Sequence, residues 1–429
     1  MGRELAREAL RRPHGSTQRR RAEPLRQRRL QDVTKKTRKH GDDLRGASRL
    51  AVDATTRVTD VVEAMHTTIA GGPALLGKPL SRPVRLLNGL VYGSIRGVTR
   101  LVGTSIEAAL AQLAPLLGES APGPQREAVL AVLNGVLGDY LAETENPLAI
   151  EMRLRHDGHT LELDPEALRA AVPSAGGKVL VLVHGSSMND QQWHRKGHDH
   201  GAALAKDLGY TPIYVHYNSG RHVSTNGREL DTWLERLVSA WPVPVDELVL
   251  LGHSMGGLVS RSAIHYGETR AWRKKLTKLV CIGAPHHGAP LERGGNWVDV
   301  LLGVSRYSTP LARLGKLRSA GVTDLRFGNV LDEHWMGRDR FAFGKDMRNE
   351  VKLPEGVDCY AIAGTTSPEG QSNRFGDGMV PVDSALGRHD QSHMTLGFPE
   401  AHRWIAYGVG HLDLLSHPQV YAQLRTWLG

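Results

Sequence analysis

The feature that most constrains the fold is an alternation of short apolar runs and helical patterns that begins at residue 176. Residues 179–183 are continuously apolar, which is typical of a strand buried on both faces of a parallel sheet. Similar runs recur further along the chain, at 212–216, 247–251, 278–282, 357–363 and 404–407. Segments with helical periodicity lie between or after them, at 200–208, 226–239, 255–266 and 419–428. This alternation predicts a doubly wound, mostly parallel α/β sheet.

Two departures from the alternation are informative. Residues 150–163 alternate apolar and polar side chains around His156-Asp157-Gly158, which predicts a β-hairpin. Residues 290–352 separate two expected strands by far more than an ordinary connecting loop. We interpret this second segment as a cap or lid inserted over the carboxyl edge of the sheet, where the sites of α/β proteins lie.

The N-terminal third of the chain is expected to be built differently. Residues 1–46 form a basic arm that we expect to be disordered: the first 49 residues carry a net charge of +10, which leaves −1 for the rest. Residues 47–145 form a helical region with stretches at 47–70, about 83–114 and about 125–141. The α/β domain then spans residues 146–429.

The arm and the helical region leave several interpretations open. Basic charge attracts nucleic acid or an anionic membrane surface. The arm has no aromatic side chain on which a base could stack, so no nucleic-acid partner is expected. The apolar helical stripes suit the core of a helical bundle, or a surface that contacts a membrane or a lipid body. A solvated tail, or a start codon chosen too early, would leave the arm without a role.

Cysteine usage and hydropathy bear on the compartment. Two cysteines are too few for a disulfide framework or a four-cysteine zinc site, and they suit a reducing compartment. No apolar run approaches the ~18 residues that a membrane span needs, and the N-terminus lacks a signal-peptide pattern. We therefore expect a cytoplasmic protein, and peripheral contact with a membrane is the alternative. Cys281 and Cys359 are expected to be buried free thiols.

A sharp turn between a strand and a helix carries the expected nucleophile. The sequence GHSMGG at 252–257 joins the strand at 247–251 to the helix at 255–266. Ser254 at the apex of such a turn needs small residues on both sides, because the backbone there is tight and strained. The start of the following helix favours developing negative charge. The turn predicts Ser254 as a nucleophile, whereas His253 is expected to be structural.

A serine nucleophile needs a base, and the base needs a carboxylate that orients it. Asp377 lies in GDGMVP after the fifth strand, and His411 follows a glycine-rich turn after the sixth. The order Ser254, Asp377, His411 is the order of an α/β-hydrolase triad. Asp413 is the next candidate for the acid.

Backbone amides supply the expected oxyanion site. The first buried strand ends in VHGSS at 183–187, where Gly185 lets the backbone approach a substrate closely. The amides of Ser186 and Met255 are the expected donors to the oxyanion. His286 and His287 suit either a polar loop or a substrate contact. The His and Asp residues between positions 190 and 200 are spaced too irregularly for a zinc site, so no metal is expected.

Residues 176–429 resemble the α/β-hydrolase superfamily, and within it the lipase and esterase branch similar to GPI inositol-deacylases. The resemblance is carried by VHG at 183–185, GHSMGG at 252–257, IGAPHHG at 282–288, DGMVP at 377–381 and GHLDLL at 410–415, together with YNSGRH at 217–222. It implies a cofactor-free serine hydrolase of carboxylic esters, often with acyl chains. It implies nothing for residues 1–150.

These observations predict an esterase or lipase that acts on a small-molecule or lipid-like acyl ester through an acyl-enzyme on Ser254. Two alternatives remain open at this point. An acyltransferase would use the same triad with an alcohol in place of water. A scaffold on a lipid surface would keep the hydrolase fold without its activity, and the complete Ser254, Asp377 and His411 set argues against it.

Overall fold

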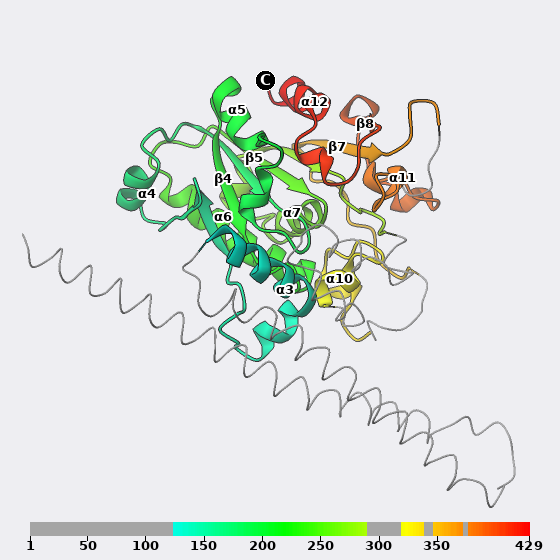
Figure 1. Cartoon of the computed structure of the whole chain (residues 1–429), viewed down its shortest axis with the longest axis horizontal. Coiled ribbons are helices and arrows are strands. Elements are labelled where there is room, and N and C mark those ends of the chain that lie inside the picture. Colours follow the sequence, from blue (N-terminus) through cyan, green and yellow to red (C-terminus); the bar gives the residue numbers. More distant parts are fainter. Residues whose placement is uncertain (1–122, 290–318, 339–345, 372–375) are drawn as a thin grey trace, which may run out of the picture.

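The structure is a computed structural model that describes residues 123–289, 319–338, 346–371 and 376–429 (Figure 1). The expected basic arm at 1–46, the expected helices at 47–70 and 83–114, and residues 290–318 of the expected cap lie outside these described residues. Across the described ranges, no helix combines the length and apolar character that a membrane crossing requires.

One mixed sheet forms the centre of the described fold. In spatial order its strands are β2 (His159–Thr160), β1 (Arg153–His156), β4 (Thr211–His216), β3 (Lys178–Val183), β5 (Glu247–His253), β6 (Leu276–Ile282), β7 (Asp358–Thr365) and β8 (Arg403–Tyr407). Neighbours from β4 to β8 are parallel, whereas β1 is antiparallel to both β4 and β2. The predicted doubly wound, mostly parallel sheet is confirmed.

The apolar runs of the sequence form strands that are buried on both faces of the sheet. In β3, Leu180 and Leu182 pack into one hydrophobic cluster, while Val181 and Val183 pack into a second cluster on the opposite face of the sheet. Successive side chains of a strand point to opposite faces, so a strand covered on both sides must be apolar at every position.

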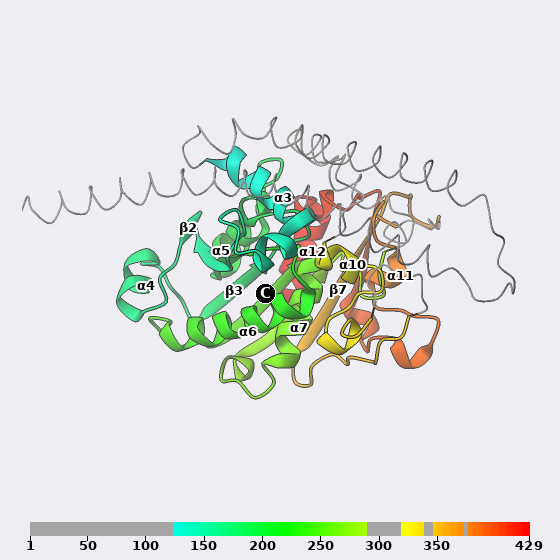
Figure 2. The ribbon, with the colours of Figure 1, turned by 90° about the horizontal axis from the view of Figure 1, so that it is seen from below.

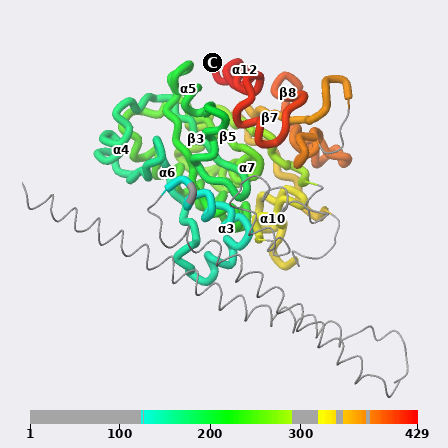
Figure 3. Tube along the Cα trace, viewed as in Figure 1, coloured from blue at the N-terminus to red at the C-terminus, as the bar shows by residue number. Residues whose placement is uncertain are grey.

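Helices cover both faces of the sheet (Figures 1 and 2). The α-helices are α3 (Pro124–Glu143), α4 (Pro165–Ala171), α5 (His200–Leu208), α6 (Val223–Ala240), α7 (Met255–Tyr266), α10 (Ala320–Asp324), α11 (Val382–Ala385) and α12 (Pro418–Leu428). The 3₁₀ turns are η1 (Asp190–Trp193), η2 (Trp272–Lys274), η4 (Asp332–His334), η5 (Ser392–Met394), η6 (Glu400–His402) and η7 (Asp413–Leu415). Helices α5 and α12, far apart in sequence, lie side by side over one face (Figure 3), whereas α3, α6 and α7 cover the other.

The predicted hairpin is present, and the geometry of its turn accounts for the residues found there. Strands β1 and β2 pair through His156 and His159, so Asp157 and Gly158 form the two-residue loop. Their φ angles are 48° and 75°. Two successive positive φ angles define a type I′ turn, for which Asp-Gly is a favoured pair.

Helix α3, expected as the last stretch of the helical region, packs into the same hydrophobic cluster as the sheet. Buried Asn134 joins the helix to the strand region that follows it, because its side-chain oxygen accepts from the amide of Ile150 at 2.9 Å. Gly135 and Gly138 face chain that lies far away in sequence: a Cβ on them would stand 2.0 Å from Ser187 Oγ and 1.8 Å from Asn218 Oδ1. The helix therefore needs glycine at both positions to lie this close.

The described part of the expected cap is fixed to the body. Buried Asp324 at the end of α10 accepts hydrogen bonds from the amide of Val223 at 2.8 Å and from His222 Nδ1 at 3.0 Å. Ser319 Oγ donates to the carbonyl of Gly135 in α3 at 2.6 Å. The expected cap or lid over the carboxyl edge of the sheet stays a prediction for residues 290–318 and 339–345, which lie outside the described ranges.

Candidate active site

The turn between β5 and α7 holds Ser254 in an unusual backbone conformation. Its φ and ψ angles are 55° and −124°, a region that residues other than glycine rarely occupy and that costs of order 1–3 kcal/mol. The Ser254 amide donates to the carbonyl of Ile282 at 2.8 Å, which fixes the turn against the end of β6. Strain of this kind persists where the surrounding structure over-determines it, as at a nucleophile.

The glycines around Ser254 are required by close contacts. A Cβ on Gly256 would stand 2.0 Å from the carbonyl oxygen of Val183, and a Cβ on Gly252 would stand 2.5 Å from the amide nitrogen of Gly257. Real Cβ atoms do not approach other atoms this closely, so both positions exclude larger residues. This is the reason for small residues on both sides of the serine.

Asp377 and His411 form a buried pair at the same edge of the sheet. His411 Nδ1 donates to Asp377 Oδ2 at 2.7 Å, and both side chains are almost inaccessible to solvent. The other carboxylate oxygen, Asp377 Oδ1, accepts from the amides of Met379 at 3.0 Å and Val380 at 2.8 Å. Because the proton of neutral His411 then sits on Nδ1, Nε2 keeps a lone pair that can accept a proton.

Gly283, which directly follows β6, lies close to both Asp377 and His411. An ideal Cβ on Gly283 would lie 3.3 Å from both Asp377 Oδ2 and His411 Cε1. Within the described chain, Ser254 Oγ makes no hydrogen bond to His411. Catalytic hydrogen bonds are often long without substrate and tighten in the complex, so this does not exclude proton transfer between them.

The two amides expected at the oxyanion site belong to residues close to Ser254 along the chain or in space. Met255 is the first residue of α7, so its amide has no acceptor within the helix. Gly185 lies against the nucleophile, since a Cβ there would stand 3.1 Å from Ser254 Cβ. The Ser186 amide donates to no other backbone carbonyl of the described ranges. Among the described residues, neither amide therefore donates to a backbone carbonyl, so each stays a candidate donor to an oxyanion.

His184 orients the Ser186 amide, a role that the sequence analysis missed. Its ring Nδ1 lies 2.8 Å from the carbonyl oxygen of Gly185, and only a donor can bind a carbonyl, so Nδ1 carries the proton. A trans peptide directs its carbonyl and its N–H to opposite sides, so holding Gly185 O on one side directs the Ser186 N–H to the other. Burial lowers the pKa of His184 to about 3, which keeps the ring neutral.

Tyr217 fixes the position of His184. The two rings stack with centroids 4.2 Å apart, and the Tyr217 hydroxyl donates to the carbonyl of His184 at 2.8 Å. VHG and YNSGRH were noticed in the sequence as separate motifs. Their contact depends on the neighbouring strands β3 and β4, whose pairing the sequence alone did not specify.

A charged network supports the loop after β3. Asp190 Oδ1 accepts from Arg155 Nη1 and from His216 Nδ1, each at 2.9 Å. Burial alone would raise the pKa of Asp190, but the hydrogen bond from His216 and the charge of Arg155 outweigh it and lower that pKa. The ionised carboxylate thus ties η1 to strands β1 and β4.

Other sequence candidates lie away from the Asp377–His411 pair or in structural contacts. Asp413, the alternative acid, pairs with Lys196 at 2.7 Å on the surface. His287 donates from Nε2 to the carbonyl of Gly387 at 3.1 Å, as a polar loop residue would. Cys281 and Cys359 are buried free thiols, as expected, and burial raises the pKa of each to about 12. Among the described residues, no group of His, Cys, Asp and Glu could hold a metal ion.

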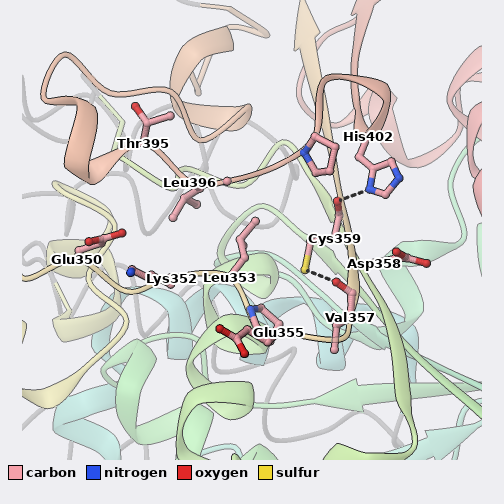
Figure 4. A pocket seen from close by; sticks show the side chains of 13 residues that line it. Glu350, Lys352, Leu353, Glu355, Val357, Asp358, Cys359, Thr395, Leu396 and His402 are labelled. Carbon is pink, nitrogen blue, oxygen red and sulfur yellow. Dashed lines mark hydrogen bonds between the residues drawn. The ribbon is translucent and has the colours of Figure 1, made fainter.

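A cavity of about 390 Å³ lies at the opposite end of β7 (Figure 4). Asp358 and Cys359 at the start of that strand line it, whereas Asp377 follows the strand's carboxyl end. His402 closes one side and holds the carbonyl of Cys359 through Nδ1 at 3.2 Å. The cavity lies at the other end of β7 from the Ser254 edge of the sheet. We therefore assign the cavity no part in the chemistry at that edge.

The comparison with protein families agrees with this geometry. Residues 174–336 match the family model described as a PGAP1-like alpha/beta domain. The match includes β3 to β6 and the Ser254 turn, and the resemblance read from the sequence is confirmed at this level. Asp377 and His411 lie beyond the residues that this family model matches.

Several solved structures are similar to this chain. The mature lipase BlEst2 of Bacillus licheniformis is 17% identical, with 65% of this chain and 98% of that chain covered and a TM-score of 0.40. Aspergillus fumigatus lipase B is 14% identical over 62% and 57% of the two chains, with a TM-score of 0.36. The Pyrococcus furiosus esterase PF2001 is 12% identical over 60% and 84%, with a TM-score of 0.36. A search of curated proteins finds no match to this sequence.

Proposed function

We propose that this protein is a serine hydrolase of carboxylic esters, with an acyl or lipid-like ester as substrate. The observation that carries the proposal is the buried hydrogen bond of 2.7 Å between His411 Nδ1 and Asp377 Oδ2, at the sheet edge where the strained Ser254 turn ends β5. The hydrogen bond between His411 and Asp377 is not needed to form the Ser254 turn, and the turn is not needed to form the hydrogen bond. Together they provide a nucleophile, a base and a group that orients the base.

The reaction proceeds in two halves. Ser254 Oγ attacks the ester carbonyl carbon while His411 Nε2 takes the hydroxyl proton, and the oxyanion binds the amides of Ser186 and Met255. The intermediate collapses when His411 returns the proton to the leaving alcohol, which leaves an acyl ester on Ser254. Water then attacks this ester with His411 as the base, and the acid product leaves with Ser254 restored. Asp377 stabilises the imidazolium in both halves.

Labelling by a fluorophosphonate probe tests the nucleophile directly. Wild-type protein should be labelled, and Ser254→Ala should abolish labelling and lower kcat by roughly 10⁴–10⁶. A panel of p-nitrophenyl esters of rising acyl length then measures the preferred chain. Full labelling of Ser254→Ala would refute the proposed nucleophile.

Two aspartates provide a matched test of the acid. Asp377→Asn should lower kcat by roughly 10³–10⁴ because the amide cannot stabilise the imidazolium. Asp413→Asn, which removes only a surface ion pair with Lys196, should retain wild-type rates. The opposite result would move the acid to Asp413.

A further inference from the structure

A second cluster of buried ionisable groups lies behind the Ser254 turn and is not used by the proposed reaction. Arg261 on α7, His286 after β6, and His334 in η4 line one cavity of about 10 Å³. All three side chains are at least nine-tenths buried. A volume of this size holds one water-sized particle.

Hydrogen bonds fix the tautomers of the two histidines. The amide of Val330 donates to His334 Nδ1 at 3.2 Å, and Arg261 Nη1 can only donate to His286 Nδ1, at 3.3 Å. Each ring is therefore protonated at Nε2 when neutral. His287 next to them has the same arrangement, and its Nε2 finds an acceptor in the carbonyl of Gly387.

Three donors have no acceptor among the described residues. Arg261 Nε, His286 Nε2 and His334 Nε2 are buried and find no hydrogen-bond partner in the described ranges. Burial without an acceptor costs each donor roughly 1–3 kcal/mol. One water accepts two hydrogen bonds at most, so a particle that only accepts suits three donors better.

The positive charge of the cluster also favours an anion in the cavity. Arg348 is paired with Asp346 at 2.7 Å, whereas Arg261 has no carboxylate within ion-pair distance in the described ranges. Burial lowers the pKa of Arg261 to about 10, so it is still a cation near neutral pH, and the nearby thiols Cys281 and Cys359 are neutral. Glu350 also lines the cavity, but its side chain is exposed and forms no ion pair with Arg261. An unpaired buried cation is costly, and a bound anion removes that cost.

We propose that this cavity binds one small monovalent anion, chloride, through Arg261, His286 and His334. The anion would join the helix that follows Ser254 to the loop after β6 and to the described part of the cap. That loop starts at Gly283, which lies against Asp377 and His411. The site would stabilise the Ser254 edge of the sheet without touching a substrate, and it does not depend on the proposed hydrolase activity.

Thermal unfolding of the full chain at constant ionic strength tests the site. Replacing sodium gluconate by sodium chloride or bromide should raise Tm saturably, by about 2–5 °C, because only the folded state binds the ion. Arg261→Met should abolish the rise. Arg228→Met, which removes an exposed arginine paired with Asp332, is the matched control and should retain it.

A direct measurement covers the case in which Arg261→Met does not fold. Crystals of the wild-type protein grown with bromide should show anomalous scattering in the cavity between Arg261, His286 and His334. An equal Tm in gluconate and chloride, or the absence of a bromide peak there, would overturn the proposal and leave water as the occupant.

Discussion

The side chain of His253 donates a hydrogen bond from Nε2 to the main-chain oxygen of His411 at 3.1 Å. The residue before the proposed nucleophile therefore holds the backbone of the proposed base. Burial lowers the pKa of His253 well below its usual 6.5, so the ring stays neutral and keeps this single donor. The expectation that His253 is structural agrees with this contact, which also gives it a place in the geometry of the site.

Removing that donor should affect turnover more than binding. His253→Phe keeps a buried ring of similar size but frees the His411 loop, so kcat should fall by roughly 10–100-fold with KM nearly unchanged. His253→Gln retains an N–H at similar reach and should recover part of the loss. Steady-state kinetics with a p-nitrophenyl ester and Tm for each variant make the test. Equal losses in both variants would mean that the ring, not the hydrogen bond, matters.

The glycine next to the turn gives a prediction that needs no substrate. Gly256→Ala would place a Cβ 2.0 Å from Val183 O and 2.6 Å from His184 O, both backbone atoms that cannot easily move. We expect a loss of about 3 kcal/mol or more in the free energy of unfolding. Gly397→Ala is the control, because no atom of the described residues lies within 4 Å of its ideal Cβ, and it should change stability by less than about 0.5 kcal/mol. Urea unfolding of both variants measures the difference.

How much the sequence could predict differs between elements. The strands were predictable because a strand such as β3, buried on both faces, has to be apolar throughout. The Ser254 turn was predictable because a sharp strand-to-helix turn needs small residues around the serine, as the close approach of Gly252 to Gly257 shows. The packing of α3 was not, since an apolar stripe does not say which surface it covers, and Gly135 meets Ser187 only after the chain has folded. The role of His184 depends on one buried ring orientation, which no spacing encodes.

Buried neutral histidines should make the fold sensitive to acid. Burial lowers the pKa of His184 and His287 to about 3, and that of His200 and His334 to about 4. Above pH 6.5 neither the folded nor the unfolded chain protonates these rings appreciably. Below it the unfolded chain takes up protons that the folded chain excludes, so the free energy of unfolding falls as the pH falls from 6.5 towards these lowered values. The slope is about 1.4 kcal/mol per pH unit for each such ring.

Single substitutions can isolate one of these contributions. His200→Gln should lower the proton uptake on unfolding by about one between pH 6.5 and pH 4, because the glutamine does not titrate. His159→Gln, on the exposed strand β2, is the control variant. Urea unfolding over this pH range gives the uptake from the slope of stability against pH. An unchanged slope in His200→Gln would contradict the assignment of a neutral buried His200.

The packing of α3 decides where the chain can be shortened. Val129, Leu133 and Leu141 of α3 are fully buried against the sheet, so a chain that begins at residue 146 would lose part of its core. It should aggregate or unfold, whereas a chain that begins at residue 119 keeps α3 and should fold. Circular dichroism and gel filtration of the two shortened chains distinguish them. Equal folding of both would mean that α3 is dispensable to the core.

The shortened chain that keeps α3 provides the test for a lipid surface. The first 49 residues carry a net charge of +10, and each Lys or Arg near an anionic membrane contributes about 1 kcal/mol to binding. We predict that the full chain co-sediments at low salt with vesicles rich in phosphatidylserine, and that the chain beginning at residue 119 does not. Raising the salt should release the full chain, because exposed charges are screened, and phosphatidylcholine vesicles should bind neither chain. If the full chain stays in the supernatant with the anionic vesicles, the membrane role of the arm is wrong. If both chains sediment, the described body itself would have to hold the lipid contact, and the charge of the arm would not be its cause.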